Sequence, residues 1–320
     1  MCAMPGLYNT KNTVDFAEFS TNTYKLQGLN MKNNLLLMGL VALLAMTGCA
    51  KHKTTPKTPP VETTLKAPLN AAIEDIWRGR QADRDVFRHP EQTLKFFGLA
   101  PDQTLIEVFP GGGWYTGILA PYAKATNGHY MAAVFDERMG ERYKKANQRF
   151  TTKFSDENKF GSIKTIPFGP NSGPLCDNCA DLIVTFRNIH SFMGRDYADK
   201  AFADFYQALK PGGVLGVVEH RLPETREQNP KAPTGYVQES YVKDLAKRAG
   251  FEFVGASDIN ANPNDTADHP FGVWTLPPTS RKPRRGDLKA SEFDAAKYKA
   301  IGESDRFTLK FRKPINTSDD

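Results

Sequence analysis

Residues 105–120 read Leu105-Ile-Glu-Val-Phe-Pro-Gly-Gly-Gly-Trp-Tyr-Thr-Gly-Ile-Leu-Ala120. An apolar run with one acid breaks into three consecutive glycines and then continues in a helical pattern. This order predicts a strand that ends in a tight turn and is followed by a helix. Glycine suits such a turn because it adopts positive φ and because its missing Cβ lets a ligand approach the backbone. The stretch therefore predicts a site for a nucleotide-like ligand.

Strand-like and helix-like segments alternate through most of the remaining chain. Apolar strands are expected at residues 105–109, 128–136, 162–167, 180–186, 214–218 and 251–254. Helical patterns fall at residues 69–97, 114–125, 138–150, 197–209 and 238–249. Such alternation predicts a parallel sheet between layers of helices, because parallel neighbours need a crossover connection that is usually a helix.

The C-terminal part departs from this alternation. Residues 260–303 are irregular and are expected to form a surface insertion that covers or borders something. Residues 306–311 alternate strictly between polar and apolar, which predicts an antiparallel last strand with one wetter face. We therefore expect an α/β fold with a doubly wound, mostly parallel, seven-stranded Rossmann-like sheet and helices on both faces. It forms one domain at residues 68–314, followed by a short tail at 315–320.

The N-terminal segment carries targeting signals rather than core residues. Met31-Lys32 precedes an apolar run at residues 35–46, and Met46-Thr-Gly-Cys49 resembles a bacterial lipobox. The run is shorter than the ~20 apolar residues of a transmembrane helix. It is typical of a secretory signal peptide at residues 31–48, after which Cys49 is lipidated and begins the mature chain. An uncleaved hydrophobic anchor is the alternative.

The segments on either side of this signal agree with it. Residues 1–30 are polar and aperiodic, which indicates a misassigned leader with Met31 as the true initiator. Residues 49–67 are rich in Lys, Thr and Pro and predict an extended tether. Ala50, directly after the lipidated cysteine, favours sorting to the outer membrane. We expect a lipid-anchored protein on the periplasmic face of a bacterial membrane.

The overall composition is that of a globular protein. The 320 residues are 40% hydrophobic and 24% charged, with a net charge of +6. Lys and Arg do not form a stripe interleaved with aromatic residues, so nucleic acid is not an expected partner. The basic run at residues 281–285 predicts a solvated loop, with an anionic surface or lipid headgroup as the alternative partner. The sequence carries no signal for an oligomeric state.

Two cysteines lie close together in the predicted domain. Cys176 and Cys179 form a Cys-Asp-Asn-Cys sequence in a loop rich in Gly, Pro and Asn. In an oxidising periplasm this spacing predicts a small loop disulfide, with two inert thiols as the alternative. A zinc site needs a second pair of ligands, and no such pair follows in the sequence. No metal is therefore expected.

Polar residues follow several of the predicted strands. Ligands of such sheets bind outside the carboxyl ends of the strands, where strand order reverses. The residues at those positions are Phe109 to Gly113, Asp136, Pro167 to Phe168, Arg187 to His190, and Glu219 to His220. An acid such as Asp136, after the second strand, suits the two hydroxyls of a ribose. A helix N-cap is the alternative role for Asp136.

Four motifs resemble those of the class I S-adenosylmethionine-dependent methyltransferases, over about residues 94–314. They are Glu107-x-Phe-Pro-Gly111-x-Gly113, Ala133-Val-Phe-Asp136, Asp181-Leu-Ile-Val with Asn188-Ile-His190, and Leu209-Lys-Pro-Gly-Gly213. The residues of these motifs are similar to those of a bacterial group of exported predicted methyltransferases. The resemblance implies S-adenosylmethionine as cofactor and a small molecule as methyl acceptor.

The resemblance also implies roles for single residues. Glu107 would orient the glycine loop or the methionine amino group, and Asp136 would bind the ribose. The loop residues would let the cofactor lie against backbone; they are Pro110, Gly111, Gly112 and Gly113. The residues bordering the methyl donor would be Arg187, Asn188 and His190. One departure is Phe109, which stands where the family usually has glycine, and which would either crowd the cofactor or turn into the core.

Methyl transfer depends mainly on alignment of the reacting atoms. A general base is needed only when the acceptor carries a proton at neutral pH. His190 and His220 are the catalytic candidates because both follow strands at the binding edge, and a structural histidine is the alternative for each. His89, His129 and His269 are expected to be structural.

Two other functions compete with a methyltransferase. A nicotinamide-dependent oxidoreductase needs Gly-x-Gly-x-x-Gly, but Thr116 occupies the third glycine position and Gly117 comes one residue late. A non-catalytic lipoprotein that binds a small molecule on the same fold is the second alternative, because the periplasm is not expected to hold S-adenosylmethionine.

Overall fold

The computed structural model describes residues 61–284, 286 and 290–315. The predicted leader, the signal peptide, Cys49 and the tether up to residue 60 lie outside the described residues. The described part is a seven-stranded sheet with the order β3-β2-β1-β4-β5-β7-β6. Its strands are β1 (Thr104–Val108), β2 (His129–Phe135), β3 (Lys164–Phe168), β4 (Ala180–Phe186), β5 (Leu209–His220), β6 (Glu252–Ser257) and β7 (Arg306–Arg312).

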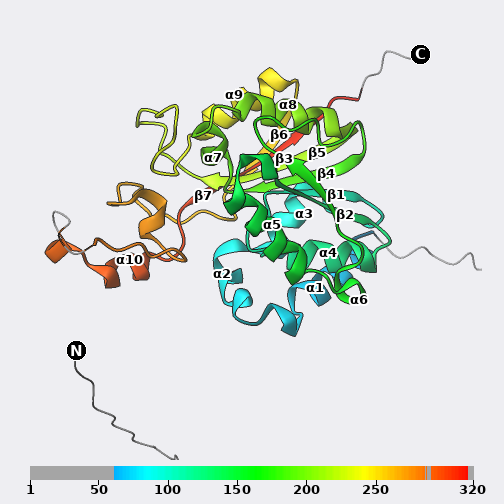
Figure 1. The fold of residues 1–320 in the computed structure, drawn as a ribbon, viewed down its shortest axis with the longest axis horizontal. Helices are drawn as coiled ribbons and strands as arrows, with labels where there is room; N and C mark the ends of the chain where they lie inside the picture. Colours follow the sequence, from blue (N-terminus) through cyan, green and yellow to red (C-terminus); the bar gives the residue numbers. More distant parts are fainter. Residues whose placement is uncertain (1–60, 285, 287–289, 316–320) are drawn as a thin grey trace, which may run out of the picture. The chain divides into compact units, whose positions relative to one another are not determined.

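Helices connect the strands and cover the sheet on both faces (Figure 1). The N-terminal group is α1 (Val61–Ile73), η1 (Ile76–Arg84), α2 (Asp85–Arg88) and α3 (Pro90–Phe97). The crossovers contain α4 (Thr116–Ala125), η2 (Glu137–Met139), α5 (Glu141–Lys153), α6 (Glu157–Phe160), α7 (Ile189–Met193), α8 (Ala198–Ala208) and α9 (Glu239–Ala249). The insertion before β7 contains η3 (Gly272–Thr275), η4 (Ala290–Glu292) and α10 (Ala295–Ile301). Helix α1 begins at Val61, so the prediction of a tether up to residue 67 is wrong for residues 61–67.

The sheet is parallel except at its C-terminal edge. Strands β3, β2, β1, β4 and β5 pair in parallel, and β7 pairs antiparallel with both β5 and β6. Of the two large core clusters, one contains Phe202 and Phe205 of α8, and the other contains Ile118 and Leu119 of α4. These clusters pack the two helical layers against the two faces of the sheet. The predicted doubly wound, mostly parallel sheet with an antiparallel last strand is confirmed.

Strand β7 has the wetter face that its alternating sequence predicts only in its C-terminal half. Arg306 and Thr308 are 3% and 0% exposed. The guanidinium of Arg306 pairs with Glu303, at 3.0 Å between Nη2 and Oε2, and Thr308 Oγ1 accepts a hydrogen bond from Asn260 Nδ2 at 2.9 Å. The first two polar side chains of β7 are therefore buried with partners, whereas Lys310 is partly exposed and Arg312 is exposed. The predicted wetter face is present only in the C-terminal half of the strand.

Strand β5 begins earlier than its sequence predicts. The Lys210-Pro-Gly-Gly213 segment, expected to precede the strand, lies within β5 (Leu209–His220). The pairing of β4 with β5 shifts register between Ala180 and Leu182. A Cβ on Gly213 would stand 2.8 Å from the carbonyl oxygen of Lys210, so this irregular pairing requires glycine. Lys210 Nζ also pairs with Asp181, at 2.8 Å from Oδ1.

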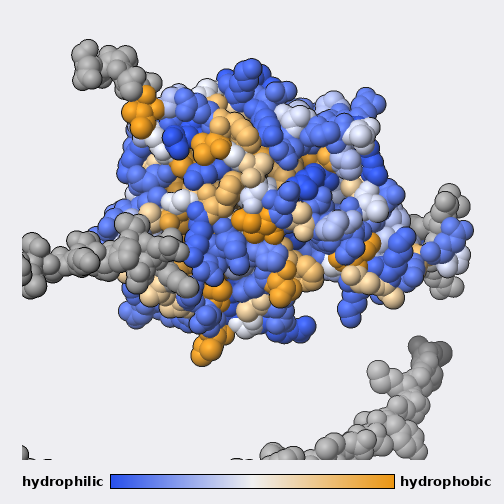
Figure 2. All heavy atoms as spheres, turned by 180° about the vertical axis from the view of Figure 1, so that it is seen from behind, coloured by the Kyte–Doolittle hydropathy of each residue, from blue (hydrophilic) through white to orange (hydrophobic). Residues whose placement is uncertain are grey.

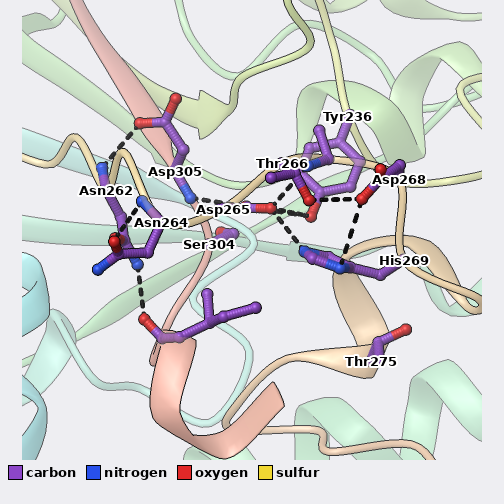
Figure 3. Close-up of polar contacts among 12 residues, drawn as sticks. Tyr236, Asn262, Asn264, Asp265, Thr266, Asp268, His269, Thr275, Ser304 and Asp305 are labelled. Atoms are coloured by element: carbon purple, nitrogen blue, oxygen red, sulfur yellow. Dashed lines mark hydrogen bonds and ion pairs between the residues drawn. The ribbon is translucent and has the colours of Figure 1, made fainter. Parts of the chain in front are cut away.

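A buried polar network fixes the insertion before β7 to the rest of the domain (Figure 3). The carboxylate of Asp265 accepts hydrogen bonds from Tyr236 Oη at 2.9 Å and from the main-chain nitrogen of Asp305 at 2.8 Å. His269 Nε2 lies 2.7 Å from Asp265 Oδ1. Asn262 Nδ2 donates to the carbonyl oxygens of Ile301 and Glu303. The insertion is therefore held at both ends.

The surface carries few large apolar side chains. Ile76, Val86 and Ile315 are exposed at 95%, 68% and 64%, and the edge strand β6 exposes Phe253 and Val254. Figure 2 shows hydrophobic residues near the middle of the rear face, bordered by hydrophilic ones. Within the described ranges, none of the helices is long and apolar enough to cross a membrane.

Candidate functional site

Two cavities open where the strands of the sheet end. Both are lined by the turn after β1, at Phe109, Pro110, Gly111 and Gly112. The apolar cavity has a volume of about 460 Å³ and lies between this turn, the end of β2 and helix α5. The polar cavity has a volume of about 320 Å³ and lies between the turn, the ends of β4 and β5, and the insertion. The turn after β1 thus borders an apolar cavity and a polar one.

The glycine turn presents bare backbone to both cavities. A Cβ on Gly112 would meet nothing within 4 Å, and one on Gly111 would meet only the Phe109 carbonyl oxygen at 4.0 Å. Gly113 differs, because its Cβ would lie 2.2 Å from the ring of Phe154, and it lines neither cavity. Gly111 and Gly112 thus leave the main chain open toward both cavities. Gly113 is required by packing.

Glu107 is a buried carboxylate at the floor of the polar cavity. Its side chain extends from β1, and the residue is 3% exposed. Oε2 accepts hydrogen bonds from Thr116 Oγ1 at 2.8 Å and from Tyr130 Oη at 2.6 Å. Burial raises the pKa of Glu107 to about 7, although both hydrogen bonds oppose the shift. No hydrogen bond from the described part of the chain reaches Oε1, which leaves an acceptor for a ligand.

Phe109 turns its ring into the core. The ring centroid lies 4.4 Å from that of Phe135, 5.2 Å from Phe168 and 5.8 Å from Phe192. The backbone at Phe109 has φ 46°, a left-handed conformation that favours glycine. This explains why the resembled family usually has glycine there. In this chain the aromatic ring forms a wall of both cavities and is packed against its neighbours.

Asp136 is not positioned as the resemblance implies. Its Oδ1 accepts a hydrogen bond from the main-chain nitrogen of Arg138 at 3.0 Å, and Oδ2 lies 2.6 Å from Arg138 Nη2. These hydrogen bonds lower the pKa of Asp136. The side chain lines neither cavity. The helix N-cap alternative describes this residue, and the predicted contact with a ribose is not supported by the geometry.

The polar groups of the apolar cavity come from helix α5, which the sequence did not single out. Asn147, Arg149 and Lys153 line this cavity beside the aromatic rings of Phe135 and Phe150. Asn147 Nδ2 donates to the carbonyl oxygen of Phe135 at 2.8 Å, and Lys153 Nζ donates to that of Gly112 at 2.6 Å. The basic character of residues 138–150 was the available signal, but a basic helix is ordinarily a solvated one.

His190 and His220 lie together in the polar cavity, as predicted for the edge residues. Their ring centroids are 5.6 Å apart. His190 Nδ1 lies 3.2 Å from Glu219 Oε1, and His220 Nδ1 lies 2.5 Å from Ser304 Oγ. Each ring is therefore oriented through Nδ1. Burial lowers the pKa of His220 well below its ordinary value, with further lowering by His190 and the nearby arginines, so the ring is neutral at pH 7.

Glu219 organises this group from the end of β5. It is fully buried, and its Oε2 accepts hydrogen bonds from the main-chain nitrogens of Ile189 at 2.5 Å and His190 at 3.3 Å. The carboxylate thereby caps the first turn of α7. Its Oε1 accepts from the main-chain nitrogen of His220 at 2.9 Å. The sequence placed Glu219 at the binding edge but did not predict this role.

The same three residues are close enough to hold a metal ion. The potential ligand atoms of His190, Glu219 and His220 lie within 4.8 Å of one another. However, both oxygens of Glu219 already accept main-chain hydrogen bonds, and the guanidinium groups of Arg187 and Arg306 lower the pKa of His220 by their positive charge. Both features oppose a cation at this position. We therefore assign no metal ion to this group.

Three arginines, of which Arg88 and Arg306 are buried, gather around one carboxylate at the wall of the polar cavity. Glu303 is 3% exposed and pairs with Arg84 at 2.6 Å, Arg88 at 3.1 Å and Arg306 at 3.0 Å. Burial favours a raised pKa for Glu303, but the three arginines outweigh it and lower the pKa to about 2. Arg84 and Arg88 come from the N-terminal helical segments η1 and α2, and the sequence singled out neither residue.

The insertion borders the polar cavity, in agreement with its predicted role. Trp274 in η3 contacts His190 edge-on at 6.0 Å between ring centroids, and Pro277, Pro278 and Thr279 add to the wall. Asn188 also lines this cavity, and its Nδ2 donates to the carbonyl oxygen of Val108 at 2.9 Å, which ties the ends of β1 and β4 together.

No family model matches the chain, and no curated protein matches its sequence. Among solved structures, it is similar to an S-adenosylmethionine-dependent methyltransferase from Aquifex aeolicus, at 21% identity and a TM-score of 0.44, covering 56% of this chain and 87% of that one. The 4+2 cyclase SpnF matches at 16% identity and a TM-score of 0.48, over 72% of this chain and 81% of its own. CrArsM, an arsenic(III) S-adenosylmethionine methyltransferase from Chlamydomonas reinhardtii, matches at 12% identity and a TM-score of 0.41, with coverages of 68% and 65%.

Likenesses of this size carry no argument about activity. The fold is assigned from the sheet itself. The order β3-β2-β1-β4-β5-β7-β6, with β7 antiparallel, is the Rossmann-like sheet of the class I methyltransferases that the sequence predicted.

Proposed function

We propose that this protein binds S-adenosylmethionine across the two cavities and transfers its methyl group to a small acceptor. The observation that carries the proposal is the bare turn at Gly111 and Gly112, which joins an apolar cavity to a polar one beside an unpaired oxygen of Glu107. The cofactor has the matching parts: an apolar adenine at one end and a charged amino acid at the other. Bound there, it supplies a methyl group activated on a sulfonium.

Each end of the cofactor finds chemistry that suits it. Phe135 and Phe150 offer the apolar cavity aromatic walls for an adenine ring. Glu107 Oε1 offers an acceptor for the methionine amino group, whose positive charge would stabilise the ionised carboxylate. Pro110, Gly111 and Gly112 leave the main chain open between these two ends.

His190 is the proposed general base for an acceptor that must lose a proton. Glu219 contacts Nδ1, so Nε2 remains to accept the proton. Glu219 is a positioning residue in this scheme because it acts through the histidine. Trp274 and the two prolines of the insertion wall this cavity, which helps to exclude water from the reacting groups.

A binding protein without catalysis is the second candidate. Asp136 is occupied by Arg138, and Phe109 stands in a left-handed position that favours glycine. Both features depart from the resembled enzymes. The two candidates are separated by incubating the full-length protein with S-adenosylmethionine and a periplasmic small-molecule extract. Release of S-adenosylhomocysteine by the wild type, reduced at least 100-fold in His190→Gln, supports the enzyme; equal background in both supports the binder.

The cofactor is tested by isothermal titration of the full-length protein with S-adenosylmethionine and, separately, with NAD. We expect binding of S-adenosylmethionine at micromolar concentration and none of NAD. Failure to bind S-adenosylmethionine at high micromolar concentration would refute the proposed cofactor, and preferential binding of NAD would restore the oxidoreductase alternative.

We also propose that the protein is exported and lipidated at Cys49, on the periplasmic face of a bacterial membrane, with sorting to the outer membrane. The lipobox-like sequence supports this, and so does the disulfide between Cys176 and Cys179, because such bonds persist in oxidising compartments. Palmitate labelling of the wild type and of Cys49→Ser tests the anchor. Labelling that is retained in Cys49→Ser contradicts it.

A further inference from the structure

The polar cavity contains more positive charge than the described residues neutralise. Arg84, Arg88 and Arg187 line it, and Arg306 is buried beside it. Glu303 is the only carboxylate in the described ranges that forms an ion pair with any of them. Three of the four guanidinium groups thus share one acid, and Arg187 forms no ion pair within the described ranges. Such an excess is typical of a site for an anion.

Several donors in this group have no acceptor. Arg88 is 3% exposed, and its Nη2 is buried without a hydrogen-bond partner. Nη2 of Arg84 is buried and unpartnered in the same way. The guanidinium of Arg187 makes no hydrogen bond or ion pair with any other residue that the structure describes. Buried donors without acceptors are rare because each forfeits its hydration, so Nη2 of Arg84 and Nη2 of Arg88 point to an absent acceptor. Arg187 is partly exposed and lines the same cavity.

The backbone holds Arg187 where it can face the cavity. Arg187 follows β4 directly and has φ 62°, a left-handed conformation that is uncommon for a residue with a side chain. Its main-chain nitrogen donates to the carbonyl oxygen of Val218 at 2.7 Å, which ties it to β5. The pKa of Arg187 is lowered to about 10 and that of Arg88 to about 9, mainly by burial. The positive charges of neighbouring arginines contribute to both shifts. A bound anion would relieve this repulsion.

We propose that Arg88 and Arg187 form an oxyanion site in the polar cavity, and that the methyl acceptor binds there through a carboxylate or phosphate group. The identification of the bound anion as the methyl acceptor rests on the proposed function. The anion site itself is inferred from the arginines alone. The site adjoins His190, so an acceptor anchored by its anionic group places its remaining atoms near the base. Planar guanidinium groups suit carboxylate and phosphate because both are bound by paired N–H donors.

The same chemistry has a second possible source, the carboxylate of the cofactor. Inorganic phosphate serves as the probe, titrated into the full-length protein at constant ionic strength, first alone and then with saturating S-adenosylhomocysteine, which carries that carboxylate. We expect phosphate to bind in both cases, with affinities within twofold. Displacement of phosphate by S-adenosylhomocysteine would assign the arginines to the cofactor and overturn the acceptor site.

Two matched variants test the residues. Arg187→Gln is expected to weaken phosphate binding at least tenfold. Arg80→Gln removes an exposed arginine of the neighbouring segment η1, and its affinity for phosphate is expected to equal that of the wild type. Arg187→Lys keeps a charge but loses the paired donors, so an intermediate affinity is expected. Equal binding by Arg187→Gln and Arg80→Gln, or no binding by the wild type, would overturn the site.

The failure of the proposed function has a different signature. If S-adenosylhomocysteine does not bind while phosphate binds in an Arg187-dependent manner, the methyltransferase proposal fails and the oxyanion site is supported. Thermal unfolding of each variant identifies a folding defect. If Arg187→Gln is unfolded, the comparison of Arg187→Lys with the wild type decides: unchanged phosphate affinity in Arg187→Lys then overturns the site.

Discussion

Glu107 makes the stability of the ligand-free protein depend on pH. Its pKa is raised from 4.5 to about 7 in the folded protein, mainly by burial. The folded state therefore holds the proton more tightly than the unfolded chain does. The contribution of Glu107 to the free energy of unfolding is greatest below pH 4.5. It falls as the pH rises from 4.5 to 7 and stays constant above 7. The shift is worth about 3 kcal/mol, at 1.36 kcal/mol for each pH unit.

The substitution Glu107→Gln removes the titration and keeps the shape. In the wild type, Tyr130 and Thr116 donate hydrogen bonds to Oε2 of Glu107. The amide oxygen of the glutamine can accept the same two hydrogen bonds. We measure the free energy of unfolding by urea denaturation of wild type and variant between pH 4 and pH 8. The wild type should lose about 3 kcal/mol relative to Glu107→Gln across this range. Taking the difference between the two proteins cancels the groups that titrate in both.

An exposed acid provides the control for this experiment. Glu74 is exposed and has no side-chain partner in the described segments. The difference in the free energy of unfolding between Glu74→Gln and the wild type should not change with pH. Curves for wild type and Glu107→Gln that run parallel from pH 4 to pH 8 would refute the reasoning about burial at Glu107. The same carboxylate predicts that S-adenosylhomocysteine binds more tightly as the pH rises through 7, and that Glu107→Gln loses this dependence.

Three further predictions concern residues around the cavities. Gly113→Ala should destabilise the protein by about 2 kcal/mol or more in urea denaturation, because Gly113 has φ 74° and its Cβ would lie 2.2 Å from Phe154; unchanged stability would contradict this packing role. Glu303→Gln should cost about 3–5 kcal/mol at pH 7, because it leaves buried arginines without their acid. Since the pKa of Glu303 is lowered to about 2, its contribution is present above pH 4.5 and is lost as the pH falls toward 2; a variant as stable as wild type at pH 7 argues against it. Asp136→Asn should leave the affinity for S-adenosylhomocysteine, measured by calorimetry, within twofold and cost about 1 kcal/mol as a weakened N-cap, whereas a tenfold loss of affinity would restore the ribose role.

The sequence predicts elements whose signal is local. Strand β4 was expected at residues 180–186 and is observed there, because its continuous apolar run is that of a strand buried on both faces. The burial of the first two polar residues of β7 was not predicted, because the alternation of polar and apolar residues reports the side-chain period and not what packs on each side. Arg306 and Thr308 are buried by partners from the insertion and from α3, which no pattern within β7 reveals.

In the candidate site, too, features with a local sequence signal were predictable and features set by tertiary packing were not. The glycine turn and the histidine pair were predictable, because the carboxyl ends of parallel strands share one edge of the sheet. Arg187 was also placed at this edge, but its neighbours Arg84, Arg88 and Glu303 were not singled out, because they are far from it in sequence and meet it only through tertiary packing. For Asp136 the sequence allowed two roles, and the choice depended on where the side chain of Arg138 points.

The most direct test of the central claim fills the turn between the two cavities. Gly112→Leu places a side chain in open space without a positive φ, and Gly173→Leu makes the same change at an exposed position that is equally open. Binding of S-adenosylhomocysteine is measured by titration calorimetry for wild type and both variants. We predict one site per chain in the wild type and in Gly173→Leu, and at least a 100-fold loss of affinity in Gly112→Leu. Equal affinity in all three proteins would contradict a cofactor lying against this turn.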